Sequence, residues 1–493
     1  MTQAQRGLVF QEKEIFGRGS SGRNGVDFPN SGIPAADISA LAGADYIRSE
    51  LKGFPELSEP EVIRHYTRLS QWNYGVDSNI YPLGSCTMKH NPRVNEAVSR
   101  LKGFAGSHPL QPDSAAQGTL KMIYDLGRWL CEIVGMDAAT LQPAAGAHGE
   151  FTGLLMIRAA LAKRGNARQK VLLPDSAHGT NPASSVYCGY QAVTIKSGPD
   201  GKIDLVELDR MMDDSVAALM VTNPNTLGVF ESDIMAAAKI VHDRGGFVYA
   251  DGANLSALIG KTRFGDLGID VCHINLHKTF STPHGGGGPG AGPVCVKKEL
   301  EPFLPVPVVM EKDGKYTMDN NMPDSVGRVH GFHGNVGVLL RAAAYILSMG
   351  PQGLKEATEA AVINANYIKA RLKDYYHTPI PGHSLHECVF NDKIQSEGNH
   401  ISTLDIAKGL IDRGFHPPTI YFPLIVKGAL MIEPTETESR EALDAFCEAM
   451  IDIAEKAKSD PESLHQAPVN AVRRRLDEAQ AARNPELRCS ICG

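Results

Sequence analysis

The pattern that most constrains the fold of this chain is a series of short apolar runs that alternate with helical periodicity between about residues 111 and 345. Such an alternation predicts an α/β domain with a mostly parallel sheet and crossover helices. We expect strands at residues 170–173, 191–195, 217–221, 246–251, 273–277 and 292–296. We expect helices at residues 58–71, 91–102, 151–161, 233–244, 353–374 and 438–458. In such sheets ligands gather at the carboxyl ends of the strands, so we look for functional residues there.

The chain of 493 residues is too long for one simple core, and its composition divides it into four parts. Residues 1–110 are predicted to form an irregular N-terminal arm with much glycine and proline. Residues 111–345 form the predicted large domain, 346–460 a smaller α+β domain, and 461–493 a polar tail.

Charge and composition exclude several classes of protein. The formal charge of −7 argues against nucleic-acid binding, and no stretch reaches the roughly 20 apolar residues that would span a bilayer. The N-terminus lacks the apolar core of a secretory signal. Nine cysteines, an odd number in a long chain, do not suggest a disulfide framework. We therefore expect a cytoplasmic protein that binds neither nucleic acid nor membrane.

A lysine follows one of the predicted strands, and a glycine run follows the lysine. Lys278 comes directly after the run 273–277, and residues 285–288 are all glycine. The preceding strand ends on Asp251. A Schiff-base lysine and a carboxylate for a pyridinium nitrogen are the two groups that pyridoxal 5'-phosphate requires. Alternatively, Lys278 is a surface lysine at a strand end and Asp251 an ordinary Asp-Gly turn residue.

Small residues near these positions suggest how a cofactor would be seated. Ala253 is small enough for a ring to lie against the backbone beside Asp251. Gly146, Ala147 and His148 precede the predicted helix 151–161, whose N-terminus would favour an anion such as a phosphate. The alternative for residues 146–148 is a plain glycine-containing turn.

Three further side chains are candidates for contacts with the cofactor. His178 follows the strand 170–173 and would stack on the ring and steer a substrate carboxylate, although a histidine that caps a helix is the alternative. Asn223 follows the strand 217–221 and would contact the ring hydroxyl, or else it is a turn residue. His277 would help to seat the cofactor, unless it only packs.

Other motifs carry less weight. The pattern at residues 17–22 matches the glycine spacing of dinucleotide sites but lacks a preceding strand and a following helix. Cys489 and Cys492 form a lone C-x-x-C motif with no second pair, so we expect no metal site in this chain.

Several strings of the sequence resemble the P-protein of the glycine cleavage system, the glycine decarboxylase family. They lie at residues 80–92, 108–112, 142–150, 249–254, 277–280 and 431–439, so the resemblance spans nearly the whole chain. Single-chain members of that family fuse two related halves. This chain has the length of one half and carries Lys278, so it looks like the catalytic partner of a separate first subunit.

The resemblance implies an aminotransferase-like, fold type I pyridoxal-phosphate enzyme with a seven-stranded, mostly parallel sheet. It implies that glycine displaces Lys278 from the cofactor and loses carbon dioxide, while Asp251 keeps the ring nitrogen protonated. The aminomethyl group would then pass to the lipoyl arm of the H-protein. Two copies of each P-protein subunit would form the enzyme.

Two other functions remain open on the sequence. One is a pyridoxal-phosphate lyase or decarboxylase of the same fold that acts on a larger amino acid. The other is a non-catalytic assembly subunit, which would need neither Lys278 nor Asp251.

Overall fold

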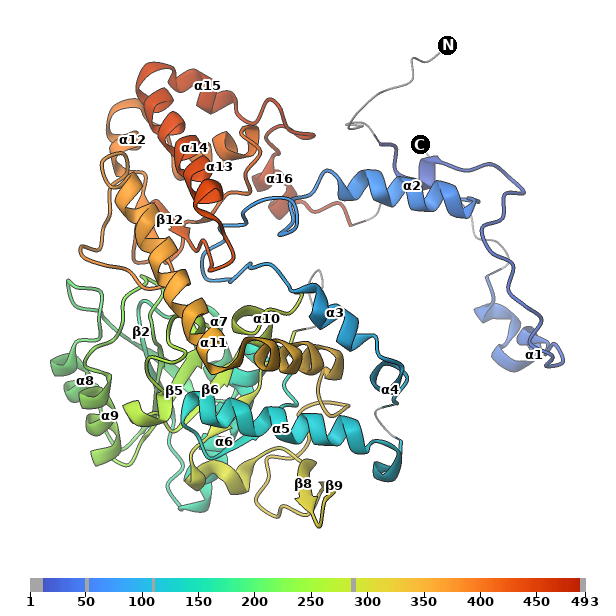
Figure 1. Ribbon diagram of the computed structural model, residues 1–493, viewed down its shortest axis with the longest axis horizontal. Coiled ribbons are helices and arrows are strands. Elements are labelled where there is room, and N and C mark those ends of the chain that lie inside the picture. Colours follow the sequence, from blue (N-terminus) through green and yellow to red (C-terminus); the bar gives the residue numbers. More distant parts are fainter. Residues whose placement is uncertain (1–11, 49–52, 109–110, 285–289, 488–493) are drawn as a thin grey trace. The chain divides into compact units, whose positions relative to one another are not determined.

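The computed structural model describes residues 12–48, 53–108, 111–284 and 290–487 (Figure 1). The glycine run at 285–288 and the pair Cys489 and Cys492 lie outside the described residues. The chain forms two compact units, one of Met1–Gly75 with Ala467–Gly493 and one of Val76–Gln466. All the predicted site residues belong to the second unit.

A seven-stranded sheet forms the centre of the second unit, in the order β1-β7-β6-β5-β4-β2-β3. Strands β2 to β6 are parallel, and β7 is antiparallel to both of its neighbours. The strands are β1 (Ala138–Thr140), β2 (Lys170–Pro174), β3 (Gln191–Ile195), β4 (Val216–Thr222), β5 (Phe247–Gly252), β6 (Val271–Ile274) and β7 (Val294–Val296). The predicted α/β fold with a mostly parallel sheet is confirmed; the short strand β1 had no apolar run to predict it.

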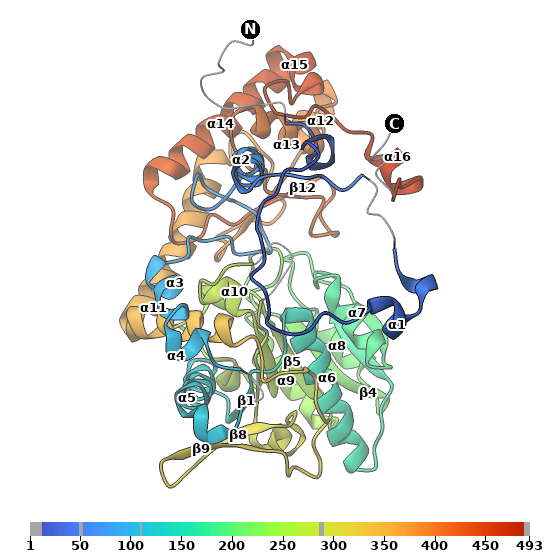
Figure 2. The same ribbon diagram turned by 90° about the vertical axis from the view of Figure 1, so that its right-hand side faces the viewer.

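Alternate residues of the strands face two separate apolar layers. One face packs against α5 (Gln117–Val134), α9 (Ile234–Asp243) and the first half of α11 (Val336–Leu372). The other face packs against α6 (Gly146–Lys163), and α7 (Thr180–Tyr187) lies beside α6 (Figure 2). Because both faces are covered, the central strand β4 is buried along its whole length. The carboxyl ends of the parallel strands therefore meet at one covered edge.

The remaining elements of the large domain are short. They are α3 (Arg93–Ser99), α4 (Lys102–Ala105), α8 (Leu205–Met211), α10 (Leu276–Thr279) and the hairpin of β8 (Val308–Lys312) with β9 (Lys315–Asp319). The predicted helix at 91–102 is thus divided into α3 and α4.

A smaller α+β domain follows, with its own core. Its antiparallel sheet has the order β10-β12-β11, with Cys388 opposite Ile432. Its elements are β10 (Cys388–Asn391), α12 (Lys393–Asn399), α13 (Thr403–Asp412), β11 (Thr419–Ile420), β12 (Ala429–Ile432), α14 (Arg440–Ser459) and α15 (Pro461–Gln466). Phe390 and Phe446 are fully buried at its centre.

Helix α11 connects the two domains and is interrupted at Gly350, where φ is 61° and ψ is 179°. Pro351 follows, and it cannot donate the backbone hydrogen bond that would continue the helix. Leu339 in the first half belongs to the large-domain core, and Ile368 in the second half belongs to the small-domain core. The two halves run in different directions (Figure 1).

The segment before α3 ties the two domains together. Leu83 forms an antiparallel bridge with Ile432, and the Gly84 amide donates to the Met431 carbonyl at 3.3 Å. A Cβ at Gly84 would lie 2.2 Å from the Met431 side chain, so only glycine fits there. The segment is thus fixed to β12 before it reaches the candidate site.

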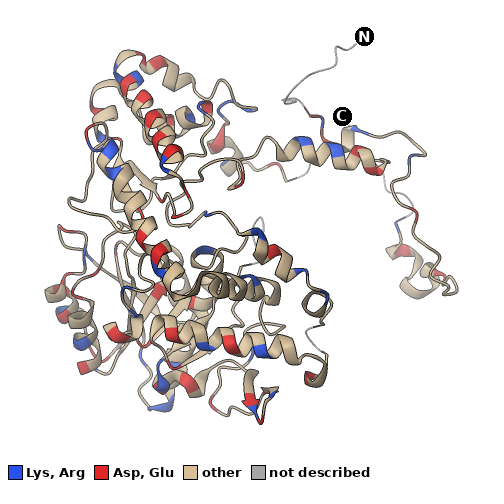
Figure 3. Cartoon of the chain, viewed as in Figure 1, with Lys and Arg blue, Asp and Glu red and all other residues tan. Residues whose placement is uncertain are grey.

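The first unit contains α1 (Ile38–Ala42), α2 (Glu59–Ser70) and α16 (Glu478–Arg483). The carboxylate of Glu12 accepts hydrogen bonds from the Arg68 guanidinium. These bonds are the main reason that the pKa of Glu12 falls to about 2. Within the ranges described, none of the helices combines the length and the apolar character needed to cross a bilayer. Acidic and basic residues alternate along the helices (Figure 3).

Candidate active site

Asp251 lies at the carboxyl end of β5 and is 2% exposed. One carboxylate oxygen accepts from the Ala253 amide at 2.9 Å and lies 3.1 Å from Nε2 of His273. The other accepts from the Asn181 amide group at 2.9 Å. Burial alone would raise the pKa of Asp251, but His273 and these hydrogen bonds hold it well below its usual range. The carboxylate is therefore ionised although it is buried.

His273 provides the charge that stabilises this carboxylate. It stands directly opposite Asp251 in the parallel pairing of β5 with β6. Burial opposes the charged ring, but Asp251 raises the pKa of His273 above its ordinary value. The other ring nitrogen of His273 lies 2.9 Å from the Tyr249 hydroxyl, so both nitrogens have partners.

Lys278 lies on the one-turn helix α10, just after β6. Its ammonium group donates to the Ser85 carbonyl at 2.7 Å. The neighbouring His277 accepts a weak hydrogen bond from the Ala291 amide, and burial lowers its pKa to about 3. His277 is therefore a neutral ring that packs beside Lys278.

The N-terminus of α6 presents small residues and no side-chain cap. Its N-cap, Ala145, has no side chain that could accept from the first amides of this helix. A Cβ at Gly146 would lie 2.6 Å from the Asn275 side chain, so glycine is required for this approach. Ala147 is exposed, whereas His148 accepts from the Ala144 amide at 3.1 Å. These residues leave backbone N–H groups free to bind an anion.

His178 lies between β2 and α7 and is half-buried. Burial lowers its pKa, while Asp251 opposes the decrease and Lys278 adds to it. Its Nδ1 lies 2.9 Å from the Thr180 hydroxyl at the start of α7, and the Phe422 ring lies 5.5 Å away, edge-on. The ring therefore shares the electrostatic surroundings of Asp251 and Lys278, and it also makes the helix-start contact that its alternative role requires.

Asn223 lies just past β4, next to the end of β5. Its side-chain oxygen accepts from the Glu231 amide at 3.1 Å, and its buried Nδ2 has no partner among the described residues. A buried donor without an acceptor is costly and indicates an absent acceptor.

Sequence reasoning missed three residues that contact Asp251 or Lys278: Asn181, His273 and Ser85. His273 could have been found, because it is a polar residue in the apolar strand β6, which pairs in parallel with the strand that ends near Asp251. Ser85 could not, since it contacts Lys278 through its carbonyl from 193 positions away.

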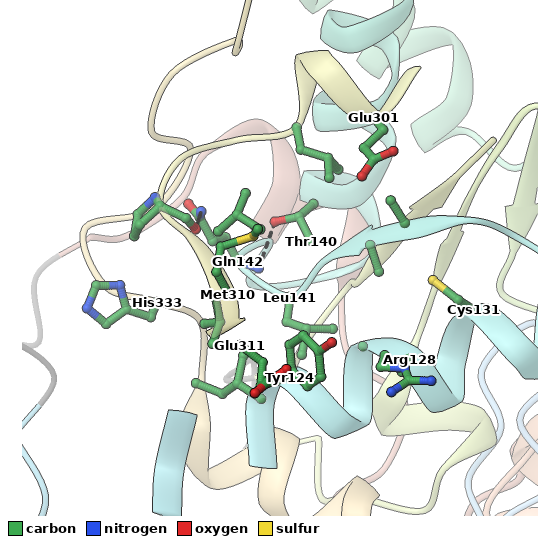
Figure 4. Close-up of a pocket in the computed structure, with 18 of the residues that line it drawn as sticks. Tyr124, Arg128, Cys131, Thr140, Leu141, Gln142, Glu301, Met310, Glu311 and His333 are labelled. Atoms are coloured by element: carbon green, nitrogen blue, oxygen red, sulfur yellow. Dashed lines mark hydrogen bonds between the residues drawn. The ribbon is translucent and has the colours of Figure 1, made fainter. Parts of the chain in front are cut away.

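A separate cavity of about 470 Å³ lies between α5, β1 and β8. Figure 4 shows polar side chains of this cavity, among them Tyr124, Arg128 and Glu301. None of the predicted site residues lines it in the described part of the chain.

Comparison with known proteins shows the family of this chain. A family model described as the glycine cleavage system P-protein matches residues 42–318, and one described as the C-terminal domain of glycine dehydrogenase matches residues 357–475. The chain is 55% identical over 475 residues to the probable glycine dehydrogenase (decarboxylating) subunit 2 of Bacillus licheniformis. That match covers 96% of this chain and 98% of the relative.

Solved structures confirm the aminotransferase-like fold. An inhibitor-bound glycine decarboxylase (P-protein) of the glycine cleavage system superposes with a TM-score of 0.72 and 22% identity, covering 84% of this chain and 94% of that one. An aspartate aminotransferase of Thermus thermophilus superposes with a TM-score of 0.55 and 12% identity, covering 76% of this chain and 99% of that one. The full-length relatives and the family models establish that this chain belongs to the P-protein family of the glycine cleavage system.

Proposed function

We propose that this chain is subunit 2 of a glycine dehydrogenase (decarboxylating) and carries the pyridoxal phosphate on Lys278. The observation that carries the proposal is the placement of Lys278 and the ionised Asp251 at the ends of the adjacent parallel strands β6 and β5. A purely structural subunit would need neither a lysine nor a costly buried carboxylate there. The 55% identity to a protein of that name supports the substrate.

The residues fit this cofactor on three counts. Asp251 is the carboxylate for the ring nitrogen, and Ala253 holds that carboxylate through its amide. The uncapped N-terminus of α6, with Gly146, Ala147 and His148, suits the phosphate. The unpartnered amide group of Asn223 suits the ring hydroxyl. When bound, pyridoxal phosphate supplies an electron sink for the pair of electrons left by carbon dioxide.

The role of Asp251 follows from its partners. Because His273 and Asn181 stabilise the ionised form, Asp251 keeps its charge in a buried place and holds a proton on the ring nitrogen. A neutral residue in its place would not keep that proton, and the electron sink would weaken.

His178 and Lys278 have roles other than that of Asp251. Burial lowers the pKa of His178, so its ring is neutral and can lie against the cofactor. The Ser85 carbonyl provides a resting place for the amine of Lys278 when it is not bound to the cofactor. His277 orients this short helix by packing.

The partners are inferred from the family. A chain homologous to a subunit 2 acts with a subunit 1, and we propose two copies of each. We also propose that a lipoylated H-protein accepts the aminomethyl group. The seven described cysteines are all free, which supports a cytoplasmic location.

Changing Lys278 to Ala tests the function. We expect loss of the visible band of the lysine-bound cofactor and a fall in carbon dioxide release from glycine of at least about 10³-fold, because the nucleophile is gone. The assay contains subunit 1 and lipoylated H-protein, and Lys239→Ala on the exposed face of α9 is the control. Unchanged turnover by Lys278→Ala would sink the catalytic assignment. Release of carbon dioxide from larger amino acids but not from glycine would favour the other lyase.

A further inference from the structure

Two carboxyl groups of the small domain are buried side by side. Glu387 directly precedes β10 and Glu433 directly follows β12, and the antiparallel pairing of Cys388 with Ile432 places the two glutamates next to each other. They are 0% and 2% exposed. Their position matters because the positive charge of Lys278 acts to lower the pKa of both.

The backbone of a single residue, Ser85, links this pair to the lysine. Glu387 accepts from the Ser85 amide at 2.9 Å, and the carbonyl of the same residue accepts from Lys278 at 2.7 Å. Ser85 holds a left-handed conformation with φ of 63°, which is costly for a residue with a side chain. Glu433 accepts from the Thr87 hydroxyl two residues further on. The two glutamates therefore hold the strand segment that positions Lys278.

The other two oxygens of the pair are unsatisfied. Oε1 of Glu387 and Oε2 of Glu433 have no hydrogen-bond partner in the described chain, and neither has either ring nitrogen of His386. His386 is fully buried, and one ligand atom from each of the three residues lies within 4.8 Å of the others. Two carboxylates this close cannot both be ionised without a counter-charge.

The charges around the pair do not balance two ionised carboxylates. Lys89 forms a buried ion pair with Glu436 at 2.6 Å, so these two charges cancel each other. Burial raises the pKa of the Cys86 thiol and lowers the pKa of His386 to about 3, so both are neutral. Among the residues that the structure describes, Lys278 is the positive charge that remains to face the pair.

One proton on the pair restores the balance. With it, the pair carries one negative charge against the one positive charge of Lys278. Burial raises the pKa of Glu433 to about 7 and that of Glu387 well above its usual range, in agreement with this count.

We propose that Glu387 and Glu433 hold one proton between them and act as positioning residues for Lys278 through the backbone amide and carbonyl of Ser85. The proposal rests on Lys278 being the reactive lysine of the proposed function. The pair keeps one compensating charge beside the free amine, and the shared proton avoids a second, uncompensated charge in a buried place.

A divalent cation is the rival occupant of this cluster. Two carboxylates and an imidazole suit several metals, but the ammonium group of Lys278 already supplies the positive charge and would repel a cation. The test therefore includes a measurement of bound metal.

The experiment is competitive acetylation of the full-length chain before any cofactor is added, with Lys278 followed by mass spectrometry against the exposed Lys239. Glu387→Gln, Glu433→Gln and the double variant are compared with the unchanged chain from pH 6 to pH 10. Glutamine keeps an oxygen for the Ser85 amide and the Thr87 hydroxyl, so these hydrogen bonds survive. Because no turnover is measured, the result does not depend on whether the chain decarboxylates glycine.

A shared proton predicts non-additive effects at pH 7. Each single variant leaves one carboxylate that ionises fully, so labelling of Lys278 stays within about twofold of the unchanged chain. The double variant loses the negative charge, and labelling rises by about tenfold, as expected for removal of an adjacent opposite charge. Above the pH at which the pair of the unchanged chain loses its proton, each single variant labels faster than the unchanged chain.

Glu231→Gln is the matched control. Glu231 is another buried glutamate whose pKa burial raises to about 7, and it contacts Asn225 rather than Lys278. We expect no change in Lys278 labelling in this variant. As a second readout, the infrared band of a protonated carboxyl at pH 7 should diminish in Glu433→Gln beyond its loss in Glu231→Gln.

Three results would overturn the proposal. The first is multiplicative effects of the two single variants at pH 7, which would mean two independent charges. The second is identical labelling in all variants. The third is a stoichiometric metal ion in the purified chain that both single variants lose.

Discussion

The surroundings of Asp251 and those of the pair Glu387 and Glu433 show two ways in which this chain buries a carboxyl group. Asp251 has an opposite charge in His273 and further hydrogen bonds from Asn181 and Ala253. The two glutamates lie close together, and in the described part of the chain each has one oxygen without a hydrogen-bond partner. Burial penalises the charge in both places, but Asp251 has a charged partner of its own in His273, whereas the two glutamates share the one charge of Lys278.

The difference teaches that partners, and not burial, decide the charge of a buried acid here. The pKa of Asp251 falls below its usual range, whereas the pKa of Glu433 rises to about 7. Asp251 thus stays ionised, and the pair of Glu387 and Glu433 keeps one proton. Four changes test this contrast.

The largest effect is expected from Asp251→Asn, which removes the permanent charge. Carbon dioxide release should fall by about 10³-fold or more, because the ring nitrogen loses the group that keeps it protonated. The assay is release of labelled carbon dioxide from glycine at saturating cofactor. A variant with more than a tenth of the original rate would contradict the role of Asp251.

The next effect concerns the proton on the glutamate pair and appears in the pH dependence of stability. The pKa of Glu433 is raised to about 7 in the folded chain, against about 4.3 in an unfolded one. Between these pH values the unfolded chain releases the proton and the folded chain keeps it, so the free energy of unfolding falls as pH rises.

The Glu433→Gln variant lacks this decrease. Between pH 5 and pH 8 its free energy of unfolding should therefore rise by about 2 kcal/mol relative to that of the unchanged chain. Urea unfolding at both pH values measures it, and Glu231→Gln should show a similar gain, since burial raises its pKa in the same way. An equal pH dependence in the unchanged chain and Glu433→Gln would show that Glu433 is ionised in the folded chain.

A smaller effect is expected from Asn181→Ala, which removes one hydrogen bond from Asp251 and leaves His273 in place. One hydrogen bond to a charged group contributes about 1.5–3 kcal/mol, so cofactor affinity should weaken by about 10- to 150-fold. Titration of the visible band with cofactor measures this change. A loss as large as that of Asp251→Asn would mean that Asn181, and not the charge of Asp251, holds the cofactor.

The smallest effect is expected from Ser85→Gly. Ser85 contacts Glu387 and Lys278 through its amide and carbonyl only, and its φ of 63° suits glycine. Lys278 labelling should stay within about twofold of the unchanged chain. Ser85→Pro, which lacks the amide and cannot adopt this φ, should change it strongly.

Strands β4 and β5 could be predicted because each is a continuous apolar run, as expected for the centre of a covered parallel sheet. The strand predicted at 273–277 is wrong in its bounds, because β6 ends at Ile274 and Leu276–Thr279 form the helix α10. The placement of Asp251 at the end of one apolar run and of Lys278 shortly after another could be predicted. Strand β1 could not, since Ala138–Thr140 is short and pairs only with the antiparallel β7.

The glutamate pair shows why the rest of the site escaped prediction. Glu387 and Glu433 meet through the pairing of β10 with β12, and Ser85 reaches them from a third segment. No local pattern of sequence records such a meeting. The partners of a side chain, which decide its charge, therefore become visible only in the fold.

The interruption of α11 at Gly350 bears on the angle between the large and the small domain. Each half of the helix is anchored in a different core, so a change in the backbone angles at Gly350 would turn the small domain relative to the large one. Ser85 would move with the small domain, because Gly84 is bonded to β12 and Ser85 to Glu387. The length of the hydrogen bond between Ser85 and Lys278 would therefore depend on the angle between the two domains.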